Sequence, residues 1–166
     1  TANQVSYRTW DGVTWSGAST LSLVTTNAAA DRIGLPVWIE MADNPLLTSN
    51  DVALLVLGSN AGNSRIYGRR WNGAAWAQLE AGAPTIWDVT VAPSTYKAMD
   101  VAYEQQTGRA MFIWGDDVSD SVRYRIWNGA TLTAGATIPG LGAMSNVASW
   151  IRLIPDPFSD QLMFGV

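Results

Sequence analysis

An all-β fold built from repeated four-stranded antiparallel units is predicted for this chain of 166 residues. Two observations predict it. A Trp-centred motif recurs along the chain, and pairs of apolar segments separated by polar turns lie between its copies. In addition, no stretch has the 3.6-residue apolar period of an amphipathic helix. These features together favour strands throughout.

The repeated motif is Arg-x-Trp-(Asp/Asn)-Gly-x-x-(Trp/Leu). Its central residue is Trp10, Trp71 and Trp127, at intervals of 61 and 56 residues. Asp-Gly and Asn-Gly are the preferred pairs for two-residue hairpin turns with positive φ. The flanking residues alternate as they do in strands. Each copy therefore predicts a tight hairpin, the first with strands at about 5–10 and 13–17.

The second repeated feature is a pair of apolar strands joined by a polar turn, at 37–58, 98–115 and 149–166. Combined with the motif hairpins, these pairs give units of four strands. We expect a single domain over 1–166, with complete units at about 33–80 and about 96–137. Residues 1–20 supply the last two strands of a third unit, and about 147–166 supply its first two.

Four antiparallel strands in about 40 to 50 residues is the size of a propeller blade. The repeats resemble the blade repeats of large bacterial secreted or surface proteins that are rich in W-(D/N)-G-x-x-W. The resemblance covers the whole chain and implies a β-propeller-like fold of three four-stranded blade units, one of them split between the N- and C-termini. It also implies an extracellular or cell-surface location.

The segment TWDGVTW also resembles the Asp-box of sialidases in its place on the turn between the third and fourth strands. The Asp-box has one more residue between Asp and Gly, and the other copies here lack its Ser or Thr. Only the strand topology therefore follows from this resemblance, without sialidase chemistry.

Three units are fewer than the roughly four to eight blades of closed propellers. We therefore expect self-association or continuation of the chain beyond this segment, which has no initiator Met. Two chains forming a six-bladed ring, a longer parent chain, and an open head-to-tail filament are the three alternatives. Each of them supplies partner strands for the split unit.

Composition excludes several classes of function. The chain has no His and no Cys, which removes the Ser-His-Asp triad, thiolate metal sites and disulfides. The net charge is −4 with Lys97 as the single lysine, so a basic face for nucleic acid is not expected. The longest apolar run, Val52–Leu57, is far shorter than the roughly 20 residues of a membrane helix. We expect no enzyme activity, no cofactor and no membrane insertion.

The aromatic hairpins are the first candidate site. In one interpretation, Trp faces stack on sugar rings while Arg and Asp or Asn bind hydroxyls, as in a lectin-like glycan-binding module. In the favoured interpretation, the central Trp residues pack between units, and the Arg residues stack on aromatic rings or pair with carboxylates. The residues are Arg8, Trp10, Trp15, Arg69, Trp71, Trp76, Arg125 and Trp127.

Glu40, Asp100 and Arg152 are single charges inside the first strand of each unit. In a propeller this strand lines the central channel, so the three side chains are expected near the axis. They form either a polar channel or ion site, or a solvated inner face with one ion pair, which is favoured. A glycosidase-like use of the two carboxylates would need a defined separation that the sequence does not give.

Asp116, Asp117 and Asp120 are a weak candidate for a calcium loop. Calcium takes six to eight oxygen ligands, and the spacing is not that of an EF-hand. A solvated turn is favoured. The sequence as a whole predicts a non-catalytic extracellular structural or adhesive module that assembles through its split unit, with the lectin-like module as the alternative.

Overall fold

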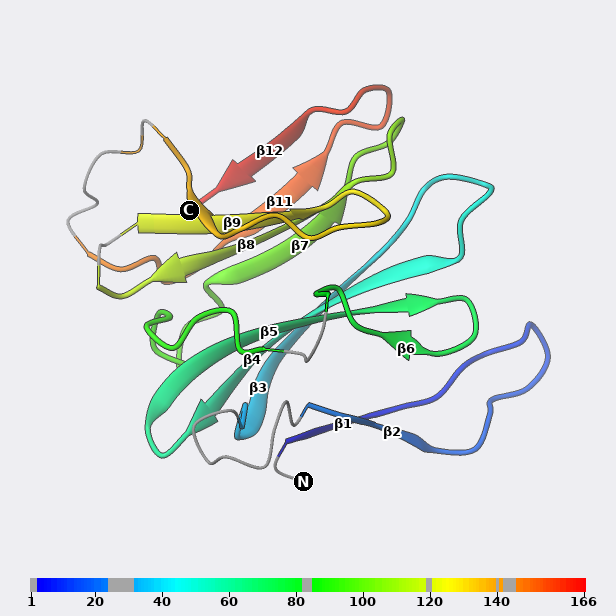
Figure 1. Cartoon of the computed structure of the whole chain (residues 1–166), viewed down its shortest axis with the longest axis horizontal. Helices are drawn as coiled ribbons and strands as arrows, with labels where there is room; N and C mark the ends of the chain where they lie inside the picture. The colour runs from blue at the N-terminus through cyan, green and yellow to red at the C-terminus, as the bar shows by residue number, and fades with distance from the viewer. Residues whose placement is uncertain (1–2, 24–31, 82–84, 119–120, 140, 142–145) are drawn as a thin grey trace.

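A computed structural model describes residues 3–23, 32–81, 85–118, 121–139, 141 and 146–166. In these ranges the regular elements are all strands, and they form four antiparallel sheets (Figure 1). The all-β prediction is confirmed. None of the described sheets closes on itself. The strands are β1 (Gln4–Tyr7), β2 (Ser19–Ser22), β3 (Leu35–Asp43), β4 (Asp51–Asn60), β5 (Asn63–Asn72), β6 (Trp76–Ala77), β7 (Met99–Tyr103), β8 (Ala110–Asp116), β9 (Ser121–Trp127), β10 (Ala136–Thr137), β11 (Arg152–Pro155) and β12 (Leu162–Gly165).

Two of the sheets have four strands in simple up-and-down order. The first sheet is β3-β4-β5-β6 and the second sheet is β7-β8-β9-β10. Each begins with two long strands joined by a polar turn and ends with the Trp-centred hairpin. The first sheet spans 35–77 and the second 99–137, within the predicted units at about 33–80 and 96–137.

The other two sheets have two strands each. The N-terminal pair is β1 with β2, and the C-terminal pair is β11 with β12. They lie at opposite ends of the molecule in Figure 1, with the two four-stranded sheets between them. β11 and β12 correspond in position to the first two strands of a four-stranded sheet, and β1 and β2 correspond to the last two.

The strand register makes the sheets directly comparable. Glu40 pairs with Leu55, which pairs with Gly68 on the next strand. In the second sheet Asp100 pairs with Ile113, which pairs with Tyr124. In the C-terminal pair Arg152 pairs with Gly165. With the repeated Trp as the common reference, the register assigns each position in one sheet to an equivalent position in the others.

Three apolar layers lie between consecutive sheets. Leu21, Leu23 and Val5 of the N-terminal segment pack on β4 and β5 of the first sheet. A second layer, which includes Trp87 and Trp114, joins the first sheet to the second. A third layer joins the second sheet to the C-terminal pair. Strand β4 is buried on both faces because it contributes to two of these layers, which explains its continuous apolar sequence.

The prediction of a two-residue turn in the repeated hairpin is wrong. Trp10 bridges Trp15, so four residues form the loop, and the other two copies have the same spacing. A two-residue turn of the Asn-Gly type needs positive φ at both positions, whereas here the Gly alone has it, with φ 99° at Gly12. The Asp11 carboxylate instead accepts the N–H groups of Val13 and Thr14 at 2.8 and 2.7 Å.

The longer loop displaces the strand that follows it. The second strand of the N-terminal pair was expected at about 13–17, but β2 begins at Ser19. The Asn residues of the other two copies hold their loops in the same way, with Oδ1 accepting two following N–H groups. The motif thus encodes a side-chain-capped four-residue loop.

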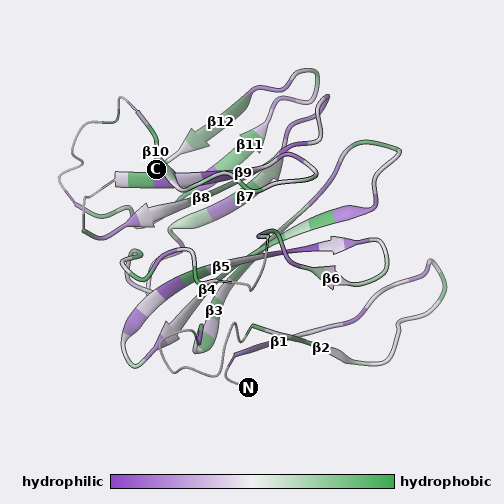
Figure 2. Cartoon of the chain, viewed as in Figure 1, coloured by the Kyte–Doolittle hydropathy of each residue, from purple (hydrophilic) through white to green (hydrophobic). Residues whose placement is uncertain are grey.

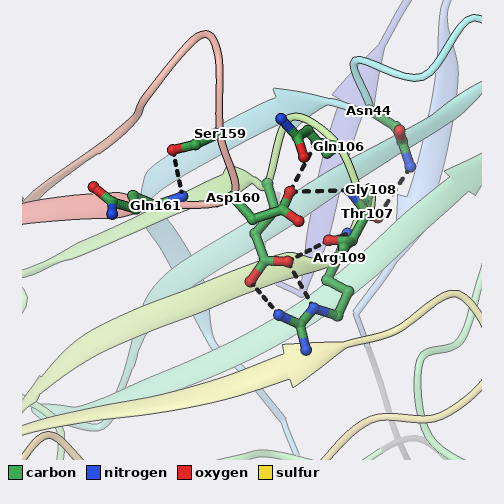
Figure 3. A network of polar contacts seen from close by, with 9 residues as sticks. Asn44, Gln106, Thr107, Gly108, Arg109, Ser159, Asp160 and Gln161 are labelled. Carbon is green, nitrogen blue, oxygen red and sulfur yellow. Dashed lines mark hydrogen bonds and ion pairs between the residues drawn. The ribbon is translucent and has the colours of Figure 1, made fainter.

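The turns that follow β3, β7 and β11 also contact one another. Asn44 Nδ2 donates to the carbonyl oxygen of Gly108 at 3.2 Å. Asp160 Oδ1 accepts the N–H groups of Gln106 and Thr107 at 2.8 and 2.9 Å, as Figure 3 shows. Arg109 pairs with Glu104 within its own turn. The first two of these contacts join the turns of consecutive sheets to each other.

Candidate functional site

The three aromatic hairpins are exposed to very different extents. Trp10 is 52% exposed, whereas Trp127, its equivalent in the second sheet, is 4% exposed. Trp71 is half-buried. The ring of Trp10 lies 5.4 Å from that of Trp15, which is also exposed. The repeated Trp is therefore a packed residue in one copy and a surface residue in another.

One aromatic cleft lies where the N-terminal hairpin meets the first sheet. Its volume is about 350 Å³. The ring of Tyr7 meets those of Trp71 and Trp76 edge-on, with centroids at 6.1 and 5.8 Å. The cleft is lined by Tyr7, Arg8, Thr9, Trp10, Met41, Val52, Trp71 and Trp76.

The motif arginines have different surroundings in each copy. Arg8 is exposed beside the cleft. The guanidinium of Arg69 is buried over the ring of Tyr67 at 4.9 Å. Arg125 lies over Trp87 at 5.3 Å, and burial lowers its pKa. The stacking partner of Trp127 is Arg70 at 5.0 Å, which occupies the variable position of the second motif copy and was not identified as a candidate from the sequence.

The structure brings Glu40, Asp100 and Arg152 to the same register position of β3, β7 and β11, along one cavity of about 290 Å³. Both carboxylates have cationic neighbours. Lys97 Nζ lies 2.6 Å from Glu40 Oε1, and Arg152 Nη1 lies 3.5 Å from Asp100 Oδ2. Asp100 also accepts the backbone N–H of Leu153 at 2.7 Å. Lys97 thus joins β3 to the segment before β7, Asp100 joins β7 to β11, and both carboxylates have a cationic neighbour.

The proposed calcium residues do not converge in the described part of the loop. Asp116 is buried and accepts the N–H of Val118 at 3.0 Å, with Arg123 at 4.0 Å. Asp117 is exposed, and Asp120 lies outside the described residues. Among the described residues no three acidic side chains form a group that would hold a metal ion.

Two apolar surfaces at the ends of the molecule were not identified from the sequence. The first, here called the β3 face, consists of Leu35, Val37, Ile39 and Met41. The second, here called the β11–β12 face, consists of Trp150, Ile154 and Met163. All of these side chains are exposed by 41% or more. In Figure 2, hydrophobic segments are present on β11 and β12 at the end of the molecule.

The positions equivalent to Ile39 and Met41 are buried elsewhere in the chain. Ile39 and Met41 are 42% and 55% exposed, whereas Met99 and Val101, at the same register positions of β7, are 0% and 4% exposed. Ile151 and Leu153 of the C-terminal segment occupy the corresponding register positions and are also buried. The difference arises because β3 packs over Met99 and Val101 of β7, and β7 packs against β11, whereas no described strand packs over Ile39 and Met41 in the same way.

A sequence signal for these surfaces exists. The segment VWIEMAD is apolar on both alternating faces, which is typical of a strand covered on both sides. In the structure only the face of β3 that carries Trp38 and Ala42 packs against the rest of the chain.

No protein-family model matches the chain, and comparisons with curated proteins and with solved structures likewise give no match. Among the described residues there is no helix with the length and apolarity that crossing a membrane would take.

Proposed function

We propose that this chain is a non-catalytic structural or adhesive module of a β-propeller-like assembly, located outside the cell or on its surface. Its split unit is completed by strands from outside this chain, either another copy or the continuation of a longer repeat protein. The observation that carries the proposal is the exposure of Ile39 and Met41 on the β3 face, because the residues at their register positions on β7 and in the C-terminal segment are buried.

The charges on the first strand of each sheet support a structural role for this chain. Glu40 and Asp100 each pair with a cation supplied by a neighbouring segment. A general acid or base would need a carboxyl free to exchange a proton with a ligand. The extracellular location rests on the resemblance of the repeats and on a composition rich in Thr, Ser, Asn and Gly.

The proposal predicts that supplying the missing strands in the same chain stabilises the protein. A second copy of residues 147–166, followed by a three-residue linker, is fused ahead of Thr1. Covering Ile39 and Met41 is expected to raise the free energy of unfolding by about 3 kcal/mol, measured by urea denaturation. The gain arises because each side chain loses its remaining apolar exposure.

The matched control is the same fusion with Ile154→Ser and Met163→Ser in the appended hairpin only. It keeps the length and the turn but removes the apolar face that would contact β3. Equal stability of the two fusions would refute completion by outside strands.

Carbohydrate binding is the second candidate, favoured by the aromatic cleft between the N-terminal hairpin and the first sheet. Edge-on rings of Tyr7, Trp71 and Trp76 beside an exposed Arg8 are suited to a neutral sugar ring with hydroxyls at its rim. Titration with neutral oligosaccharides is expected to shift the Trp emission, and Trp10→Ala is expected to abolish that shift. Unchanged emission up to about 10 mM sugar, some ten times a millimolar Kd, would exclude this function.

A further inference from the structure

We propose that the missing half-unit is supplied by a second copy of this chain, with β12 of one copy pairing antiparallel with β1 of the other so that Gly165 lies opposite Tyr7. This inference rests on the proposed function and names the partner. We call this interface between two copies the joint. Four of its contacts follow from contacts already present inside the chain.

The first is the strand pairing. Among the described residues β12 pairs with β11 alone, and β1 pairs with β2 alone. In the complete sheets the second and third strands pair as Leu55 with Gly68 and as Ile113 with Tyr124. The equivalent residues of the split unit are Gly165 and Tyr7. An exposed strand edge is a ready site for a complementary strand, and these two edges have matching register.

The second contact joins the two uncovered faces. Inside the chain, β7 lies against β3, and its Met99 and Val101 are buried by that contact. In the joint, β11 of one copy takes the place before β3 of the other. Ile154 and Trp150 then cover Ile39 and Met41, which are the equivalents of Met99 and Val101. Each uncovered face is thus the partner of the other.

The third contact explains why Trp10 and Trp15 are exposed in the single chain. Within the chain, Tyr7 packs edge-on against the Trp pair of the following hairpin, Trp71 and Trp76. Tyr124 is the equivalent of Tyr7 in the second sheet, and it is half-buried. In the joint, the following hairpin is that of the second copy. Tyr124 therefore meets Trp10 and Trp15 of the second copy, which accounts for their exposure in the single chain.

The fourth contact is electrostatic. Strands β3, β7 and β11 carry Glu40, Asp100 and Arg152 at one register position. The side chain of Arg152 is 58% exposed although it lies 3.5 Å from Asp100. In the joint, β11 is followed by β3 of the second copy, so Arg152 lies beside Glu40 of that copy. Opposite charges at this position favour the head-to-tail order over the reverse one.

Cysteine cross-linking tests the register directly, because the natural chain contains no Cys. Thr9→Cys and Met163→Cys are made as two separate proteins and mixed in equal amounts. The equivalent pair inside the chain is Ile126 with Met111. Directly opposed residues of antiparallel strands have Cα atoms about 4.5 to 5.5 Å apart, within the range of a disulfide. Oxidised glutathione is expected to convert most of the mixture into a covalent dimer.

The control mixture pairs Thr9→Cys with Val118→Cys. Val118 is 76% exposed, like Met163 at 75%, but it lies on the turn after β8 away from the joint. Cross-linking at least tenfold faster in the first mixture supports the joint. Equal rates in the two mixtures overturn it, and circular dichroism of each protein confirms that it is folded.

Two further measurements separate this inference from the proposed function. Light scattering of the wild type over a dilution series is expected to give a mass at least twice the 17.9 kDa of one chain, and Ile154→Asp is expected to reduce it to one chain. A discrete dimer and long filaments both support the second copy as partner. If the hairpin fusion is stabilised while the mixed cysteine proteins do not cross-link, the second copy is excluded and completion by a longer chain stands.

Discussion

Replacing Trp87 by Ala is expected to lower the free energy of unfolding by about 4 kcal/mol, the range of buried Trp truncations. Trp87 is 7% exposed and lies in the layer between the two four-stranded sheets. Its ring meets Phe112 edge-on at 5.1 Å and lies 6.0 Å from Trp114. The guanidinium of Arg125 lies over the same ring. Urea denaturation measures the loss.

The ring also depends on a glycine opposite it. A Cβ atom on Gly68 would lie 2.1 Å from the Trp87 ring. Gly68→Ala in the natural chain is therefore expected to cost about 2 kcal/mol from overpacking, but close to nothing in the Trp87→Ala background. Additive losses in the double variant would contradict this contact. Val89→Ala, at an exposed side chain of the same connecting segment, is the control and is expected to stay within about 0.5 kcal/mol.

This contact also accounts for a difference between the hairpins three residues before the central Trp, where the second hairpin has Gly68 and the others have Tyr7 and Tyr124. Gly68 occupies the register position of Tyr7 and Tyr124. The Trp87 ring, which comes from the segment after β6, fills the space that a Tyr side chain would take there. A repeated sequence pattern could not reveal the exchange, because the replacing side chain lies outside the repeat.

The strand pairs and their order within the sheets could be predicted from the sequence because they depend on local patterns. Alternation of apolar residues fixes which segments are strands, and the repeated order fixes which strands are neighbours. The alignment of Glu40, Asp100 and Arg152 follows from the same patterns, and the register of the strands shows it.

The loop geometry and the site were harder to predict. Asp-Gly favours a two-residue turn by propensity, but the Asp11 side chain stabilises a longer loop by accepting two N–H groups. The unequal exposure of Trp10 and Trp127 depends on which neighbouring sheet is present, and this is a tertiary property. The buried residues of the connecting segment between the sheets, Trp87 and Asp88, carry no repeat signal at all.

Asp88→Ala is expected to destabilise the protein by about 3 kcal/mol, because it leaves buried donors without their acceptor. The side chain of Asp88 is 4% exposed. Its Oδ2 accepts the indole N–H of Trp114 at 2.9 Å and lies 2.9 Å from Nη1 of Arg123. Its Oδ1 accepts the N–H and hydroxyl of Thr90 at 2.9 and 2.8 Å. Asp117→Ala, at a nearby exposed carboxylate, is the control and is expected to change stability by less than about 0.5 kcal/mol.

The same residue makes stability depend on pH in a defined direction. Burial raises the pKa of Asp88, but the hydrogen bonds from Trp114 and Thr90, with the charge of Arg123, hold it below its ordinary value. A carboxyl with a lowered pKa in the folded protein contributes stability above its unfolded pKa, near 4, and loses that contribution as the pH falls through the folded value.

The difference in unfolding free energy between the wild type and Asp88→Asn is therefore expected to be constant from about pH 7 to 5 and to narrow below about pH 4. Asp11 and Asp160 also have lowered pKa values, but they titrate in both proteins and cancel in the difference. A gap that stays constant down to about pH 2.5 would show that the charge of Asp88 contributes nothing to stability beyond its hydrogen bonds.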